Sequence, residues 1–164
     1  MRNIGFSILI LAACGATAWG QTENGHSGQG YVFFAPGSMS RSHTLLLHAG
    51  GGGEGLIFKG LGAGAEIGYL FPRWYVGDGI GLFSVNGSYH FGARTPGRKL
   101  VPFVTAGYSL AFRGGHANLA NFGGGVHYWF TDRVGLRAEF RDHVWACSYC
   151  SSHLWGVRVG VAFR

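Results

Sequence analysis

Apolar and polar residues alternate with a period of two along residues 134–144, and this segment carries much of the chain's small supply of charge. Successive side chains of a β-strand point to opposite faces, so the pattern predicts a strand with one apolar face and one charged face. The apolar face consists of Val134, Leu136, Ala138 and Phe140. The opposite face consists of Gly135, Arg137, Glu139, Arg141 and His143.

Seven further runs alternate in the same way or are apolar throughout, and turn residues separate them. Each run is about 8 to 15 residues long, close to the roughly 9–11 residues that a tilted strand needs to cross a bilayer. The eight runs cover residues 28–35, 43–53, 60–71, 78–92, 99–112, 122–130, 134–144 and 154–163.

Composition decides between a soluble and a membrane barrel. Charged residues make up 12% of the chain, well below the roughly 25% of ordinary soluble domains. Aromatic residues reach 15% and glycines number 31, which suits a barrel wall with aromatic girdles and crowded strands. A soluble lipocalin-type barrel would put its polar face outside, which the charge on residues 137–141 argues against. We predict an all-β, eight-stranded antiparallel up-and-down transmembrane β-barrel over residues 28–164.

An even number of strands places both ends of the barrel domain on the same side, which in bacterial barrels is the periplasm. The turns predicted at 54–59, 92–98 and 131–133 are then periplasmic. The loops predicted at 36–42, 72–77, 113–121 and 146–153 face outward, and their shortness leaves little material for a large binding surface.

The N-terminus predicts export to the bacterial outer membrane. Residues 1–20 combine one positive charge, a short apolar core and small residues, so we expect a cleaved signal peptide followed by a periplasmic tail over 21–27. An alternative is lipidation at Cys14, because Leu11–Ala–Ala–Cys14 resembles a lipobox. The chain after Gln21 has no apolar stretch of transmembrane-helix length.

Three segments of the second half carry a family resemblance: 100–108 (LVPFVTAGY), 121–130 (NFGGGVHYWF) and 135–142 (GLRAEFRD). They resemble the small outer-membrane β-barrel family that includes the barrel domain of outer-membrane protein A, and the first half matches in pattern. The resemblance implies a structural or interaction role. Family chains end on an aromatic residue read by the barrel assembly machinery, and here Phe163 stands one residue earlier.

Five charged residues have inward parity in the predicted barrel. The interior of an eight-stranded barrel is just wide enough to be filled by side chains, so charges there must pair. We expect a lumen charge network of Glu66, Arg137, Glu139, Arg141 and Arg158. A small ion-conducting pore is the alternative. We assign no catalytic, cofactor-binding or metal site, and the chain is predicted not to be an enzyme.

Histidines suggest one rival function. His48, His90 and His127 share the inward parity and are expected to fill the lumen. Ser88 and His90 could belong to a lipid A-modifying barrel enzyme, but hydrolysis would need them to face lipid beside a carboxylate.

Two cysteines lie in the predicted 146–153 loop, and the spacing His143-x3-Cys147-x2-Cys150-x2-His153 could surround a zinc ion. Thiols of exported proteins are usually oxidised, so we predict a Cys147–Cys150 disulfide. Free thiols and a metal site remain the alternatives.

The net charge of +6 is spread over strands and turns without a basic run, so we expect no nucleic-acid partner. The expected partners are outer-membrane lipid, lipopolysaccharide and the barrel assembly machinery. Arg41, Arg73 and Arg113 would lie near the outer leaflet, within reach of lipopolysaccharide phosphates. We expect a monomer.

Overall fold

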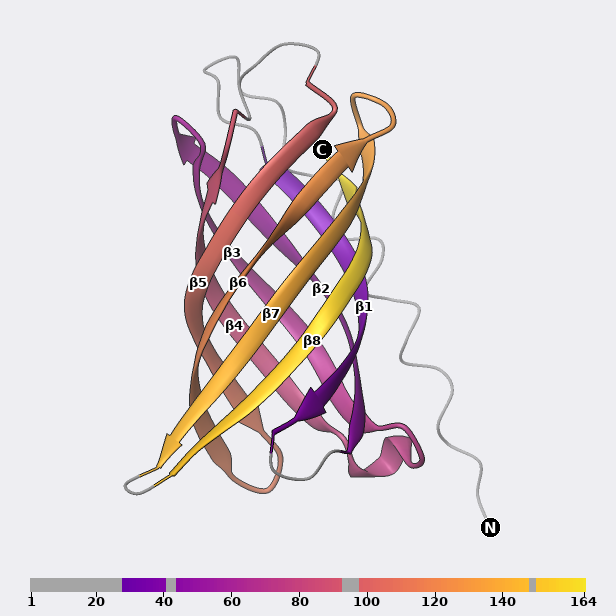
Figure 1. The fold of residues 1–164 in the computed structure, drawn as a ribbon, viewed down its shortest axis with the longest axis vertical. Coiled ribbons are helices and arrows are strands. Elements are labelled where there is room, and N and C mark those ends of the chain that lie inside the picture. The colour runs from indigo at the N-terminus through magenta and orange to yellow at the C-terminus, as the bar shows by residue number, and fades with distance from the viewer. Residues whose placement is uncertain (1–27, 41–43, 93–97, 148–149) are drawn as a thin grey trace.

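The computed structural model describes residues 28–40, 44–92, 98–147 and 150–164, so the expected signal peptide, the 21–27 tail and Cys14 lie outside the described residues. Each strand pairs antiparallel with the next, and the last strand pairs with the first. This closed up-and-down order confirms the predicted fold class (Figure 1). The strands are β1 (Gly28–Met39), β2 (Leu45–Phe58), β3 (Leu61–Pro72), β4 (Ile80–His90), β5 (Leu100–Phe112), β6 (His116–Trp129), β7 (Val134–Cys147) and β8 (Cys150–Phe163).

The barrel has two ends that differ in their connections. The inner end carries the β2–β3, β4–β5 and β6–β7 turns together with Gly28 and Arg164, and it lies at the top of Figure 1. The outer end carries the β1–β2, β3–β4, β5–β6 and β7–β8 connections. The names follow the predicted topology, in which the inner end is periplasmic.

Strands reach further toward the outer end than the sequence predicts. Residues 36–39, 116–121 and 150–153 belong to strands, although the turn signals around them predicted loops. Their antiparallel neighbours continue in register and satisfy the backbone groups, which outweighs the local signals. Pro36 interrupts the pairing on one side of β1. It pairs with Leu47 on β2, but the β1–β8 register skips residues 35 and 36. Proline has no N–H to donate to the neighbouring strand.

The predicted turn at 54–59 begins too early. β2 continues to Phe58, and the chain reverses at Lys59 and Gly60, whose φ angles are +45° and +95°. Glycine adopts positive φ without steric cost, so Gly60 suits this tight reversal. Glu54 therefore lies inside a strand rather than in a turn.

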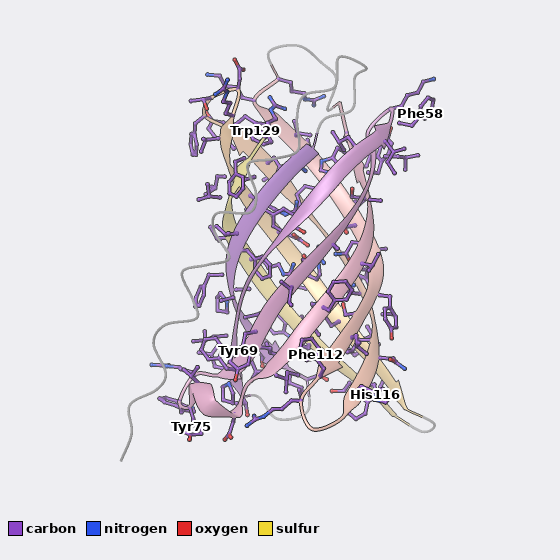
Figure 2. The ribbon with its side chains drawn as sticks, turned by 180° about the vertical axis from the view of Figure 1, so that it is seen from behind. Phe58, Tyr69, Tyr75, Phe112, His116 and Trp129 are labelled. Carbon is purple, nitrogen blue, oxygen red and sulfur yellow. The ribbon has the colours of Figure 1, made fainter. Side chains whose placement is uncertain are left out.

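Alternation along the strands separates an apolar exterior from a polar interior, as predicted. Outward side chains include Val85, Val104 and Val159, about half of whose surface is exposed. Aromatic side chains gather toward both ends: Figure 2 shows Phe58 near the inner end, and Tyr69 and Phe112 near the outer end. The described residues contain no helix of the length and apolarity required to span a membrane.

The β3–β4 connection contains a 3-10 turn, Val76–Asp78, where the sequence predicted a plain loop. Arg113 on the neighbouring connection donates from Nη2 to the Gly77 carbonyl (2.7 Å) and from Nη1 to the Gly79 carbonyl (3.0 Å). The Tyr69 hydroxyl donates to the Val76 carbonyl at 3.0 Å. These three bonds give the connection its shape without a regular ladder.

Candidate functional site

Six charged side chains in the lumen form the candidate site, and every one of these residues is buried. The structure places all five residues predicted for the lumen network there and adds Glu54. Three arginines thus face three glutamates: Arg137, Arg141, Arg158, Glu54, Glu66 and Glu139. These residues belong to β2, β3, β7 and β8. Alternate side chains of each strand point into the lumen, and these six residues occupy inward positions.

The outer part of the network is a bidentate ion pair. Arg158 donates from Nη1 to Glu66 Oε2 (3.0 Å) and from Nη2 to Glu66 Oε1 (2.8 Å). The Tyr31 hydroxyl donates to Glu66 Oε2 at 3.0 Å. Arg141 adds a longer contact, with Nη1 3.5 Å from Glu66 Oε1. Two parallel N–H···O bonds fix this pair in geometry as well as in charge.

Glu139 joins two arginines at the centre. Arg141 Nε and Nη2 both lie 2.5 Å from its Oε1, and Arg137 Nε and Nη2 both lie 3.0 Å from its Oε2. All three residues are on β7, at positions two apart, so they share the inward face of one strand. The strand that alternates most clearly in the sequence therefore forms the spine of the network.

Glu54 completes the network near the inner end. Its Oε1 contacts His90 Nε2 at 2.5 Å and accepts a hydrogen bond from the Ser88 hydroxyl. Its Oε2 accepts a bond from Gln29 Nε2 (3.3 Å) and lies 3.6 Å from Arg137 Nη1. Sequence reasoning missed Glu54 because the preceding glycines suggested a turn. Continuing the parity of His48 along β2 would have placed it inward.

Aromatic rings surround the guanidinium groups. Arg137 lies between the rings of Tyr31 and Phe103, with its Cζ 4.3 Å and 4.2 Å from their centroids, and Arg158 lies 4.2 Å from the centroid of Phe33. The Phe103 ring, which contacts Arg137, is itself stacked with the rings of His90 and His127. Stacked rings favour a desolvated cation and exclude water from it.

A layer of small polar groups adjoins the ion pairs. The hydroxyls of Ser84 and Ser109 are 2.8 Å apart, and Asn121 donates from Nδ2 to Ser109 Oγ at 2.8 Å. Asn121 Oδ1 accepts a long bond of 3.4 Å from Arg141 Nη1. The lumen thus continues as a hydrogen-bonded filling rather than as an open channel across this layer.

His48, His90 and His127 point into the lumen, as their parity predicted, and the structure places histidines toward both of its ends. His127 Nε2 lies 3.1 Å from Arg137 Nη1, and His48 Nδ1 lies 3.3 Å from Arg158 Nη2. Toward the outer end, the Nε2 atoms of His48 and His143 are buried and have no hydrogen-bond partner among the described residues. No group of three or more His, Cys, Asp or Glu side chains within the described part of the chain could hold a metal ion.

The zinc arrangement considered for residues 143–153 is wrong, because His143 is buried in the lumen whereas His153 lies on the outside of the wall. One metal ion cannot reach both faces of the sheet. The structure pairs the backbones of Cys147 and Cys150 directly, which also shortens the predicted 146–153 loop. Their side chains lie outside the described residues, so the disulfide stays a prediction.

Ser88 and His90 both point into the lumen and bind Glu54 there, away from any lipid-facing position. A second carboxylate–histidine pair of the described chain lies outside the lumen: His153 Nδ1 is 2.7 Å from Asp142 Oδ2 near the outer end. The Ser40 hydroxyl accepts a hydrogen bond from the backbone N–H of His153 (3.1 Å), so this contact is with the main chain of His153 and not with its imidazole.

Comparison with solved structures identifies the architecture. The N-terminal β-barrel domain of Pseudomonas aeruginosa OprF matches with a TM-score of 0.62 and 20% identity, over 84% of this chain and 98% of that one. The chain has the fold of the small outer-membrane β-barrels. Neisserial surface protein A matches with a TM-score of 0.58 and 17% identity, over 85% and 98% of the two chains.

A de novo designed transmembrane β-barrel shares the same fold, with a TM-score of 0.53 and 18% identity over 82% of this chain and 93% of that one. No protein-family model matches the chain, and no curated protein sequence is significantly similar to it. The likeness to outer-membrane barrels is thus one of architecture, which agrees with the predicted resemblance.

Proposed function

We propose that the protein is an integral outer-membrane barrel whose lumen is closed by ion pairs, and that it acts as a structural or interaction protein rather than as a channel or an enzyme. The observation that carries this proposal is the pairing of three arginines with three glutamates in the lumen. An ion entering the lumen would have to break these pairs in a site from which water is largely excluded, which is costly.

The outer-membrane location is supported by the apolar exterior and by the fold. Val32, Ile67 and Val159 each expose about half of their surface on the outer wall. Contiguous exposure of this kind is rare in soluble monomers and marks contact with lipid or another protein. Fractionation of bacterial envelopes should recover the folded protein with the outer membrane, and recovery in the soluble periplasmic fraction would contradict this location.

The outer end fits lipopolysaccharide as a partner. Trp74 and Tyr75 are strongly exposed on the β3–β4 connection, and Arg73 lies over the Trp74 ring at 4.6 Å. Figure 2 shows Tyr75 at the side of the barrel at the outer end, where the headgroups of an outer leaflet would lie. Arg41, the third basic residue suggested for this contact, lies outside the described residues.

Planar-bilayer recording tests the closed lumen. The folded protein should show no stepwise conductance, because the contacts of Glu66, Glu139 and Glu54 fill successive parts of its lumen. Steady conductance of the wild-type protein would overturn the structural role in favour of the pore alternative. Release of fatty acid from labelled lipid A, lost in His153→Gln, would overturn the non-enzymatic assignment.

A further inference from the structure

The charges outside the lumen are distributed unequally between the two ends of the barrel. Among the described residues, the side chains exposed at the inner end include five cations and one carboxylate, that of Asp132. Among the described residues of the outer end, Arg73 and Arg113 are balanced by Asp78 and Asp142. The five inner-end cations, which we call the inner rim, are Lys59, Arg98, Lys99, Arg133 and Arg164.

The inner rim is a ring rather than a patch. Lys59 lies in the β2–β3 turn, Lys99 immediately before β5, Arg133 in the β6–β7 turn and Arg164 after β8. In a closed barrel whose strands follow chain order, these positions recur about every second strand around the circumference. A protein partner docking from one side would contact part of such a ring, whereas a lipid leaflet surrounds all of it.

The rim cations have no carboxylate partner among the described residues. The ion pairs of this part of the chain involve lumen groups, Arg113 with Asp78, and His153 with Asp142. Arg98 and Arg164 donate to backbone carbonyls, those of Leu100 (3.1 Å) and Asp132 (2.8 Å). Arg164 also lies over the Trp129 ring, with its Cζ 4.2 Å from the ring centroid. No side-chain carboxylate of the described residues therefore neutralises the positive charge of the rim.

The height of the rim matches the headgroup region of a bilayer. Lys59 Nζ lies 5.0 Å from the centroid of the Phe58 ring, and Figure 2 shows Phe58 at the extreme of the barrel. Arg133 directly precedes the exposed Val134, and Lys99 directly precedes the exposed Leu100. Aromatic and apolar side chains at a girdle lie at the membrane interface, so cations one residue beyond them reach lipid phosphates.

We propose that the inner rim binds the headgroups of anionic phospholipids in the leaflet around that end of the barrel. Basic residues beside a membrane are attracted to anionic lipid, and the attraction falls off within a Debye length, so it weakens as salt is added. The balanced outer end offers no comparable ring among the described residues. The proposal goes beyond a closed structural barrel, because it names a lipid class and an end.

Spin-labelled lipids measure this preference directly in reconstituted bilayers. Spin-labelled phosphatidylcholine reports insertion, and spin-labelled phosphatidylglycerol reports selectivity, both from the motionally restricted fraction. Because both leaflets have the same composition, the orientation of the protein does not affect the result. We expect the wild-type protein to prefer phosphatidylglycerol roughly two- to fivefold at low salt and less at high salt.

Three variants separate charge from fold. Lys59→Gln, Arg98→Gln, Lys99→Gln and Arg133→Gln combined should remove most of the preference while the phosphatidylcholine signal persists, because Arg164 alone remains of the rim. Lys59→Arg, Arg98→Lys, Lys99→Arg and Arg133→Lys combined should retain it. Arg73→Gln, which removes one exposed cation from the outer end, should lower the preference far less than the four-glutamine variant does.

Three results would overturn the proposal. One is an equal affinity of the wild-type protein for the two lipids. Another is a loss of preference in Arg73→Gln as large as in the four-glutamine variant. The third is rim-dependent binding of isolated peptidoglycan in detergent without any lipid preference, which would identify an acidic wall polymer as the occupant.

Discussion

The lumen and the inner rim use the same residue types in opposite ways. In the lumen three arginines meet three glutamates, and Arg141 and Glu139 are almost fully buried. At the rim five cationic side chains are exposed, with one nearby carboxylate side chain in the described chain. A buried charge must be paired because it has lost water, whereas an exposed charge keeps its hydration and needs no partner. Burial, and not residue type, therefore decides which charges support the fold.

Removing a carboxylate from each region should give the largest contrast. Glu139→Ala leaves both Arg137 and Arg141 without their closest partner, and we expect a loss of about 3–5 kcal/mol in the free energy of unfolding. Asp132→Ala at the rim should change it by less than about 0.5 kcal/mol. Urea titration of both proteins in liposomes measures the difference. Equal losses would show that the lumen pairs do not stabilise the barrel.

A charge placed on the outer wall tests a third environment. Ala138 faces outward between Arg137 and Glu139, so Ala138→Arg should cost about 2–4 kcal/mol if it lies near the bilayer midplane. The matched control is Gly115→Arg in the β5–β6 connection, where an added Cβ has nothing within 4 Å. Folding yields into liposomes compare the two. If Ala138→Arg inserts as well as the control does, the wall is not in contact with lipid.

A hydroxyl can be removed from each environment without changing the ring. Tyr31→Phe loses the bond to Glu66 in the lumen, which should cost about 1.5–3 kcal/mol because the acceptor is charged and buried. Tyr108→Phe loses an exposed bond to Asn118 and should be close to neutral. Urea titrations give both changes in the free energy of unfolding from the shift of the midpoint, provided that the denaturant slope (m-value) stays constant. A neutral Tyr31→Phe would mean that water or another group satisfies Glu66.

The smallest effect is expected at the β7–β8 connection. Cys147 and Cys150 lie opposite each other in the register, and a disulfide there would close a very short loop that removes little entropy from the unfolded chain. Replacing both with Ser should therefore leave the unfolding midpoint nearly unchanged. Mass spectrometry of the unreduced protein tests the bond itself, and two free thiols would exclude it.

The order of the strands and the side to which residues point could be predicted from the sequence, because both follow from a period of two. The lumen positions of Glu66, Arg137, Glu139, Arg141 and Arg158 are examples. Strand ends could not be predicted well: Pro36 and the glycines before Glu54 resemble turn signals, yet cross-strand pairing keeps them in strands. Pairing is a non-local property that local residue types do not report.

The contacts between side chains in the lumen could not be predicted from the sequence either. Parity indicates that Arg137 and Glu54 point inward, but their 3.6 Å contact depends on which strands face each other across the barrel. The same holds for His153, which sequence spacing grouped with His143 although a sheet separates them. The number of strands and the stagger of their hydrogen-bond register determine these distances across the barrel. A single sequence motif contains neither of them.

The most direct test of the whole account compares two neighbouring residues on β5. Val104 is half exposed on the outer wall, whereas Thr105 is buried and donates from its hydroxyl to the Gly87 carbonyl. Both carry methyl groups, so NMR of the unmodified protein in lipid nanodiscs can detect their contacts with acyl-chain protons. The account predicts strong cross-peaks from lipid methylenes to the Val104 methyls and none to the Thr105 methyl. Lipid contacts at Thr105, or water contacts alone at Val104, would contradict it.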